Sequence, residues 1–107
     1  MKVELARYKK LQKRIQKLGV VIPGTLRVIY QRCGKPSCKC SSGLSKDKHG
    51  PYTYWDRKHS GKLTSSSISK KNIKYFKEGI RNRKELDKIY QQMLKIGEKY
   101  ATKINKQ

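Results

Sequence analysis

The sequence is poor in acidic residues and has no long apolar segment. Only 7 of its 107 residues are Asp or Glu, and they are scattered, whereas metal-dependent nucleases need clustered carboxylates. No uninterrupted apolar stretch is longer than that from Val20 to Ile22, which is too short for a membrane span or a signal-peptide core. A Gly-rich phosphate loop is also missing. These absences argue against an enzyme and against a membrane partner, and lead us to expect a cytoplasmic protein.

Positive charge is what the chain has in excess. It carries 28 Lys and Arg and a net charge of +21. A compact fold with this charge repels itself unless a polyanion lies near it, and nucleic acid is the commonest polyanionic partner. Lys outnumbers Arg, and Lys binds phosphate as a point charge, whereas Arg favours bidentate contacts to guanine. The composition therefore predicts binding to the nucleic-acid backbone without sequence readout.

The order of the patterns predicts an α+β fold in one domain over residues 1–107. Apolar residues at helical spacing predict an N-terminal helix over 1–19, and Gly19 is a natural stop. Three stretches rich in β-branched or aromatic residues within 25–68 predict a small three-stranded antiparallel sheet with a zinc-knuckle-like loop. Residues 69–105 predict one long basic helix, with Ser69 as its N-cap. Hydrophobic residues make up only 35% of the chain, so the core is thin.

An unbroken apolar stripe runs along the long helical segment. Its members step by three and four residues, so they share one helix face: Leu86, Ile89, Met93, Ile96 and Tyr100. Such a stripe usually packs on another helix. The partner is either the first helix, in an intramolecular core, or a second copy of the chain in a homodimer, and the sequence leaves both open.

Basic residues form a second stripe in the same segment, on the face expected to lie opposite the apolar stripe. A run of charge is commonly a solvated helix face, but few acids interrupt this one. Like charges at helical spacing destabilise an isolated helix, so a row of phosphates would favour the arrangement. The predicted nucleic-acid contacts are Lys70, Lys74, Lys77, Arg81, Lys84 and Lys88, and in the first helix Lys10, Lys13, Arg14 and Lys17.

All three cysteines lie in one loop between two expected strands. Cys33, Cys38 and Cys40 stand in Cys-Gly-Lys-Pro-Ser-Cys-Lys-Cys, and His49 follows nine residues later. Three thiolates and one imidazole are a standard set for tetrahedral zinc, and pairing of the flanking strands would bring Cys33 and His49 together. We therefore predict structural Zn²⁺ on these four residues, with free thiols or a disulfide as alternatives. Substitutes for His49 as the fourth ligand are His59 and Asp47.

The cysteine motif and the segments beside it resemble a small prokaryotic domain family. The matching segments are Pro23-Gly24-Thr25-Leu26, Cys33-Gly34-Lys35-Pro36 with the two further cysteines, and Lys48-His49-Gly50-Pro51-Tyr52. The resemblance covers roughly residues 23 to 90 and includes a basic helical tail. The family is one of uncharacterised function, so the resemblance supports the grouping of the cysteines with His49 and implies no activity.

Aromatic residues gather on the second expected strand among basic neighbours. Alternation places Tyr52 and Tyr54 on one face and Trp55 on the other. We expect Tyr54 on the core face and treat Trp55 as a candidate for stacking on an exposed base. Arg57 and Lys58 complete this candidate contact.

These patterns together predict a basic, sequence-independent nucleic-acid-binding protein. We expect double-stranded DNA as the partner, in an architectural or accessory role that would place the protein at the nucleoid. An RNA-binding or ribosome-associated protein is the first alternative. A coiled-coil interaction module for an acidic protein is the second, from a different class.

Overall fold

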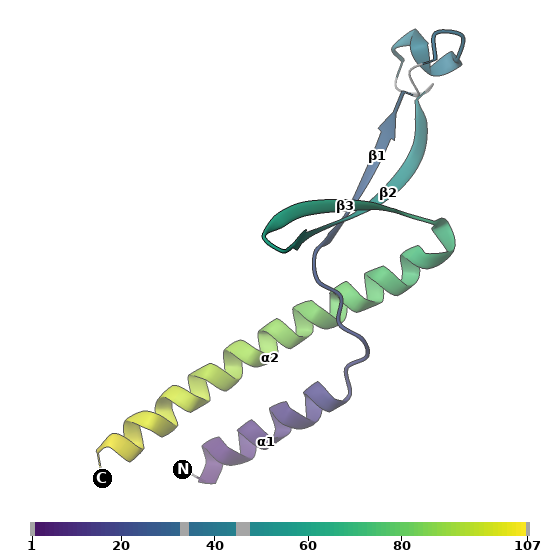
Figure 1. The fold of residues 1–107 in the computed structure, drawn as a ribbon. Helices are drawn as coiled ribbons and strands as arrows, with labels where there is room; N and C mark the ends of the chain where they lie inside the picture. Colours follow the sequence, from purple (N-terminus) through teal and green to yellow (C-terminus); the bar gives the residue numbers. More distant parts are fainter. Residues whose placement is uncertain (1, 33–34, 45–47, 107) are drawn as a thin grey trace. The chain divides into compact units, whose positions relative to one another are not determined.

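The computed structural model describes residues 2–32, 35–44 and 48–106, and it confirms the expected α+β fold class. The elements follow in the expected order, with two short 3₁₀ turns added (Figure 1). They are α1 (Lys2–Gln16), β1 (Thr25–Gln31), η1 (Lys39–Ser42), β2 (His49–His59), β3 (Lys62–Ile68), η3 (Lys70–Asn72) and α2 (Ile73–Asn105). None of the helices that the structure describes is long and apolar enough to cross a membrane.

The chain divides into two compact units. The first, here called the helical unit, consists of Met1–Ile22 and Gly79–Gln107, and the second, the sheet unit, of Pro23–Glu78. Helix α2 therefore contributes its first residues to the sheet unit and the remainder to the helical unit. Each unit has its own packing and is described separately.

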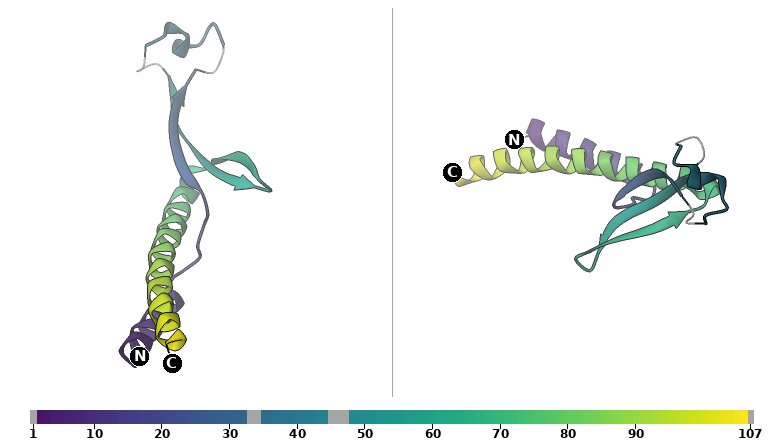
Figure 2. Two further views of the ribbon diagram at one scale, coloured as in Figure 1. Left: turned by 90° about the vertical axis from the view of Figure 1, so that its left-hand side faces the viewer. Right: turned by 90° about the horizontal axis from the view of Figure 1, so that it is seen from above.

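Helices α1 and α2 lie side by side in the helical unit (Figures 1 and 2). The apolar stripe from Leu86 to Tyr100 faces α1 at Ile89, which is completely buried, and Leu11 of α1 is 6% exposed. The sequence left open whether this stripe packs on the first helix or on a second copy of the chain. In the structure it packs on the first helix, α1. The intramolecular interpretation of the stripe is thus the one that the fold adopts.

Two ion pairs show that the helices run antiparallel. Lys103 Nζ lies 2.6 Å from Glu4 Oε1, and the Arg14 guanidinium pairs with Glu85. The hydrogen bond from Lys103 is the main cause that lowers the pKa of Glu4 to about 2. Early residues of α1 thus meet late residues of α2, and late residues of α1 meet early ones.

The segment after α1 is held against α2 at Gly79. The Ile22 amide donates to the Gly79 carbonyl over 3.0 Å, and Asn82 Nδ2 donates to the Val20 carbonyl over 2.9 Å. A Cβ atom at position 79 would lie 2.4 Å from the Ile22 side chain. Only glycine therefore lets the chain approach the helix this closely.

This contact gives a prediction with a built-in control. Gly79→Ala and Gly97→Ala make the same change in the same helix, and each removes the roughly 1 kcal/mol helix cost of glycine. A Cβ at position 97 meets nothing within 4 Å in the same chain, so Gly97→Ala should stabilise the monomer. Gly79→Ala adds an overpacking cost of about 1–3 kcal/mol. Urea unfolding should therefore separate the two variants by that amount, and equal stabilities would contradict the packing described.

The sheet unit is a meander of three antiparallel strands in the order β1-β2-β3. Trp55 pairs across the sheet with Leu26 and Ser66, and these residues share one face. The Trp55 ring packs on Phe76 of α2, with ring centroids 5.2 Å apart, and its Nε1 donates to the Pro23 carbonyl over 2.7 Å. The packed face of the sheet is therefore the Trp55 face.

Tyr54 lies on the other face of the sheet, which corrects the expectation that it belongs to the core face. Its cross-strand neighbours are Arg27 and Ser67, and the Arg27 guanidinium carbon lies 5.1 Å from the centre of its ring. Alternation correctly separates Tyr54 from Trp55. Which face is packed depends on where Phe76 lies, and strand periodicity does not contain that information.

Candidate nucleic-acid interface and Cys–His loop

Helix α1 and the turn residue directly after it present a cationic row. Its members step by three, four and three residues and are all exposed: Arg7, Lys10, Arg14 and Lys17. Three of them were predicted contacts, and Arg7 extends the row by one turn toward the N-terminus. The fourth predicted residue, Lys13, is also exposed; three residues after Lys10 and four before Lys17, it lies on the adjoining side of the same helix.

Helix α2 presents a second cationic row within the helical unit. At 3.6 residues per turn, its members share one side of the helix: Arg81, Lys84, Lys88, Lys95 and Lys99. This side lies slightly more than a third of a turn from the stripe that faces α1. The cations therefore lie to one side of the contact with α1 rather than directly opposite the apolar stripe, and Lys95 and Lys99 reach the edge of that contact.

A groove runs between the two rows, with a volume of about 460 Å³. Its walls are cationic and its floor includes the apolar side chains Leu11 and Ile96. The basic residues that line it are Arg7, Lys10, Arg14, Lys95 and Lys99. Of these five, only Lys10 and Arg14 were predicted from the sequence.

Three residues of the predicted basic stripe belong to the sheet unit. Lys70 lies in η3, and Lys74 and Lys77 lie in the first turns of α2; all three are exposed. Lys74 Nζ lies 5.0 Å from the centre of the neighbouring Tyr75 ring. The predicted stripe from Lys70 to Lys88 is thus shared between the two units, three residues in each.

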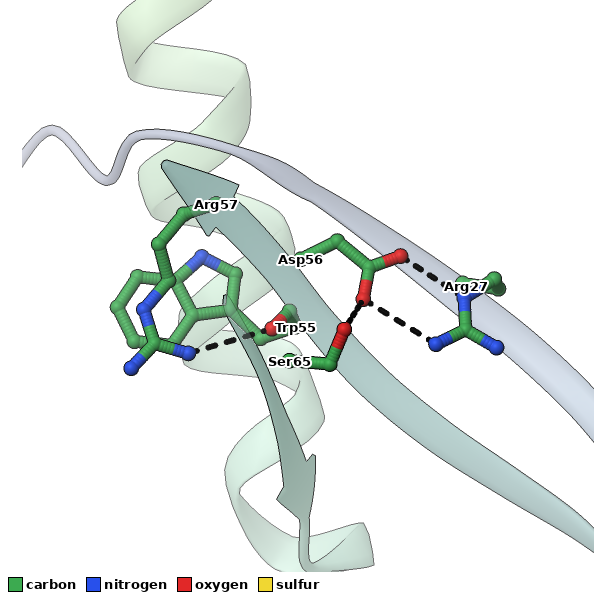
Figure 3. A network of polar contacts seen from close by, with 5 residues as sticks. All are labelled: Arg27, Trp55, Asp56, Arg57 and Ser65. Carbon is green, nitrogen blue, oxygen red and sulfur yellow. Dashed lines mark hydrogen bonds and ion pairs between the residues drawn. The ribbon is translucent and has the colours of Figure 1, made fainter. Parts of the chain in front are cut away.

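The predicted stacking residue, Trp55, has contacts on its ring and on its nitrogen. The Arg57 guanidinium carbon lies 4.0 Å from the centre of the Trp55 ring (Figure 3). Phe76 also packs on this ring. Arg57 is itself held by Ser66, whose Oγ accepts a 2.7 Å hydrogen bond from Nη1. A base that stacked on Trp55 would have to displace one of these neighbours. Lys58, by contrast, is exposed.

The face of the sheet that carries Tyr54, opposite the Trp55 face, has no basic patch among its described residues, because its arginine, Arg27, is paired with Asp56. Arg27 Nε donates to Asp56 Oδ2 over 2.8 Å, and Ser65 Oγ donates to the same carboxylate (Figure 3). The hydrogen bond from Arg27 is the largest cause that lowers the pKa of Asp56. The two charges offset one another, so this face offers less to a phosphate than the helical unit does.

The Cys–His loop lies at the end of the β1–β2 hairpin (Figure 1). Cys38 Sγ and His49 Nε2, separated by 11 residues in sequence, lie 3.0 Å apart. Strand pairing brings His49 opposite Gln31. A Cβ atom on Gly50 would lie 2.9 Å from the Ile29 carbonyl oxygen, at a φ of +139°, which explains why glycine follows the histidine.

Two of the four predicted metal ligands are thus in contact, and the others lie outside what the structure describes. Cys33 is outside the described residues, as are Asp47 and the side chain of Cys40. Among the side chains that are described, no group of three or more His, Cys, Asp and Glu is close enough to hold a metal ion. His59 is at the opposite end of β2, about 30 Å along the strand from His49, so it does not reach the loop.

One protein family matches the chain. Its model, described as a domain of unknown function (DUF6788), covers residues 8–78. The chain belongs to the DUF6788 family. No curated protein and no solved structure matches it.

The DUF6788 match covers only part of the candidate interface. It includes most of α1, the three strands, the Cys–His loop and the start of α2. The cationic row of α2, from Arg81 to Lys99, follows the matched segment. Membership of the DUF6788 family is consistent with the resemblance to an uncharacterised family, and it assigns no function to any residue.

Proposed function

We propose that this protein binds nucleic acid without sequence preference, through its phosphate backbone, with double-stranded DNA as the favoured partner. The observation that carries the proposal is the pair of cationic rows that flank one groove in the helical unit. Fifteen Lys and Arg belong to this unit against four acids. Three of those acids are already held by basic side chains, namely Glu4, Glu85 and Asp87.

The dimensions of the rows suit a phosphate backbone. From Arg7 to Lys17 the α1 row extends about 15 Å, and from Arg81 to Lys99 the α2 row extends about 27 Å, at 1.5 Å per residue. One DNA strand presents a phosphate about every 3.4 Å along the helix axis. The shorter row therefore passes about four phosphates of one strand, and the longer row passes more.

The character of the side chains favours phosphates over base edges. Most cations of the two rows are lysines on exposed helix positions, which suit phosphate contacts better than bidentate readout of guanine. One of the arginines, Arg14, is tied to Glu85. The RNA alternative relied on a base stacking on Trp55, and Arg57 and Phe76 already pack on that ring. RNA binding is therefore treated as one outcome of the test.

A salt titration tests the proposal. Fluorescence anisotropy should show log affinity for duplex DNA falling linearly with log salt, with a slope that corresponds to several phosphates at about 0.9 each. Scrambled duplexes of equal length should bind equally. Single-stranded DNA and duplex RNA serve as matched competitors, and tighter binding to RNA would replace the DNA assignment. Absence of binding to all three at low salt would overturn the proposal.

We also propose that the Cys–His loop holds structural Zn²⁺ on Cys33, Cys38, Cys40 and His49. The contact between Cys38 Sγ and His49 Nε2 supports it, since their 3.0 Å separation is close to the roughly 3.5 Å between two ligands of a tetrahedral zinc with bonds of about 2.3 and 2.0 Å. A small outward movement of the two side chains would admit the ion. Zinc would supply folding free energy to a hairpin end with little apolar packing.

A further inference from the structure

A second apolar stripe of α2 is exposed on the surface of the helical unit. Its residues step by four, three, four and three, so they share one side of the helix: Tyr90, Leu94, Gly97, Ala101 and Ile104. Tyr90 is 54% exposed, Leu94 49% and Ile104 45%. A Cβ atom at Gly97 would meet nothing within 4 Å. We call this stripe the exposed seam; at 1.5 Å per residue it is about 21 Å long.

The exposed seam is distinct from the stripe that packs on α1. The buried residue Ile89 marks the direction of α1, and the centre of the exposed seam lies about a quarter of a turn from it. The step pattern of the exposed seam is the heptad spacing of helices that pack lengthwise on another helix. Helix α2 therefore has one apolar face covered within the chain and a second that is not.

The charge pattern around the exposed seam is unlike that of the rest of the helix. On one side, the residues next to the exposed seam are Gln91, Glu98 and Asn105. On the other side they are Met93 and Tyr100. None of these is basic, in a chain with 28 Lys and Arg. The lysines Lys95, Lys99 and Lys106 of the same segment lie about half a turn away, on the side of the cationic row.

We propose that the exposed seam is the contact surface for a second copy of this chain. Two copies with a charge of +21 each repel one another over most of their surfaces, and this stripe lets them meet without opposing cations. A two-fold symmetric contact brings the same surface of both copies together, and the residues of the exposed seam carry no charge that would oppose itself across such a contact. An acidic partner fits less well, because the flanks offer it Glu98 and no cation. The cationic rows remain outside this contact and stay available to phosphates.

Light scattering coupled to size-exclusion chromatography tests the pairing in the absence of nucleic acid. The full chain, freed of bound nucleic acid by nuclease and high salt, should elute at twice its 12.5 kDa mass, with a dissociation constant below about 100 μM. Leu94→Lys places a cation in the exposed seam and should yield a monomer. Thr102→Lys adds the same charge to the same helix outside the seam and should remain a dimer. Association should strengthen with salt, since salt screens the repulsion between copies.

Three results would overturn the pairing. They are a wild-type monomer at concentrations well above that constant, a dimer that survives Leu94→Lys, and equal dissociation of both lysine variants. Circular dichroism confirms that the helices persist, and Tyr90→Lys supplies a second variant if Leu94→Lys loses helix. Nucleic-acid affinity is not part of the readout, so this inference and the proposed function succeed or fail separately.

Discussion

Replacing Lys10, Lys95 and Lys99 together by alanine should weaken binding to duplex DNA about 500-fold at 0.1 M salt. Each contact between a lysine and a phosphate contributes about 0.9 to the slope of log affinity against log salt, or roughly eightfold in affinity at 0.1 M. The three residues line the groove from both helices and are all exposed. Their loss should also reduce the slope itself by about three.

A second triple variant separates the groove from net charge. Lys9, Lys62 and Lys71 are exposed and lie outside the groove, and their replacement by alanine removes the same three charges. This control should bind DNA with nearly the original slope. If the two triple variants lose affinity equally, the general positive field of the protein drives binding and the groove is not the contact.

The sequence predicted the kinds of elements because their patterns are local. The spacing of apolar residues identifies both helices, and β-branched or aromatic stretches identify three strands. Gly19 and Ser69 mark the neighbourhood of helix ends, although α1 ends at Gln16 and α2 begins at Ile73. Differences of this size arise because helix ends depend on a few hydrogen bonds, such as that from the Asn72 amide to the Ser69 carbonyl.

Only Lys10 and Arg14 of the five basic residues that line the groove were predicted from the sequence. The groove itself forms where two helices pack together. Arg7 stands three residues before Lys10, and Lys95 seven after Lys88, so periodicity alone was sufficient to include both. The pair Gln91 and Gln92 interrupts the run, however, and the predicted stripe ended at Lys88. That Lys95 and Lys10 line the same groove follows from the antiparallel packing of α1 on α2, which no spacing within one helix encodes.

The packed face of the sheet could likewise not be predicted from residue spacing within its strands. Alternation places Trp55 and Tyr54 on opposite faces, but a three-stranded sheet has two faces and the strands alone do not say which is packed. Phe76, which lies after the strands in sequence, makes that choice by packing on Trp55. Antiparallel pairing of the strands that flank the Cys–His loop predicted that His49 lies near the cysteines, and the structure shows this contact for Cys38; the predicted neighbour Cys33 lies outside the described residues.

The proposed zinc site predicts that chelation has the largest effect on stability. Structural zinc sites contribute apparent binding free energies of about 10–16 kcal/mol in small zinc domains at neutral pH. Protein purified without chelator should contain one Zn²⁺ per chain. Exhaustive chelation should lower the thermal midpoint sharply and abolish cooperative unfolding of the sheet unit, and added Zn²⁺ should restore both.

The two histidines provide the matched variants for this test. His49→Ala removes the imidazole that contacts Cys38 and should weaken zinc binding by more than the 10- to 100-fold that loss of a supporting residue around a metal site costs. His59→Ala removes the same side chain at the opposite end of β2 and should leave zinc binding unchanged. Substitution of Co²⁺ for Zn²⁺ should give the absorption of a thiolate-bound tetrahedral ion in His59→Ala and lose it in His49→Ala. If metal-free protein melts at the same temperature as the untreated sample, the zinc proposal is wrong. Cys38 and His49 would then be a thiol–imidazole pair, and the reactivity of the thiol toward thiol reagents would be the property to measure.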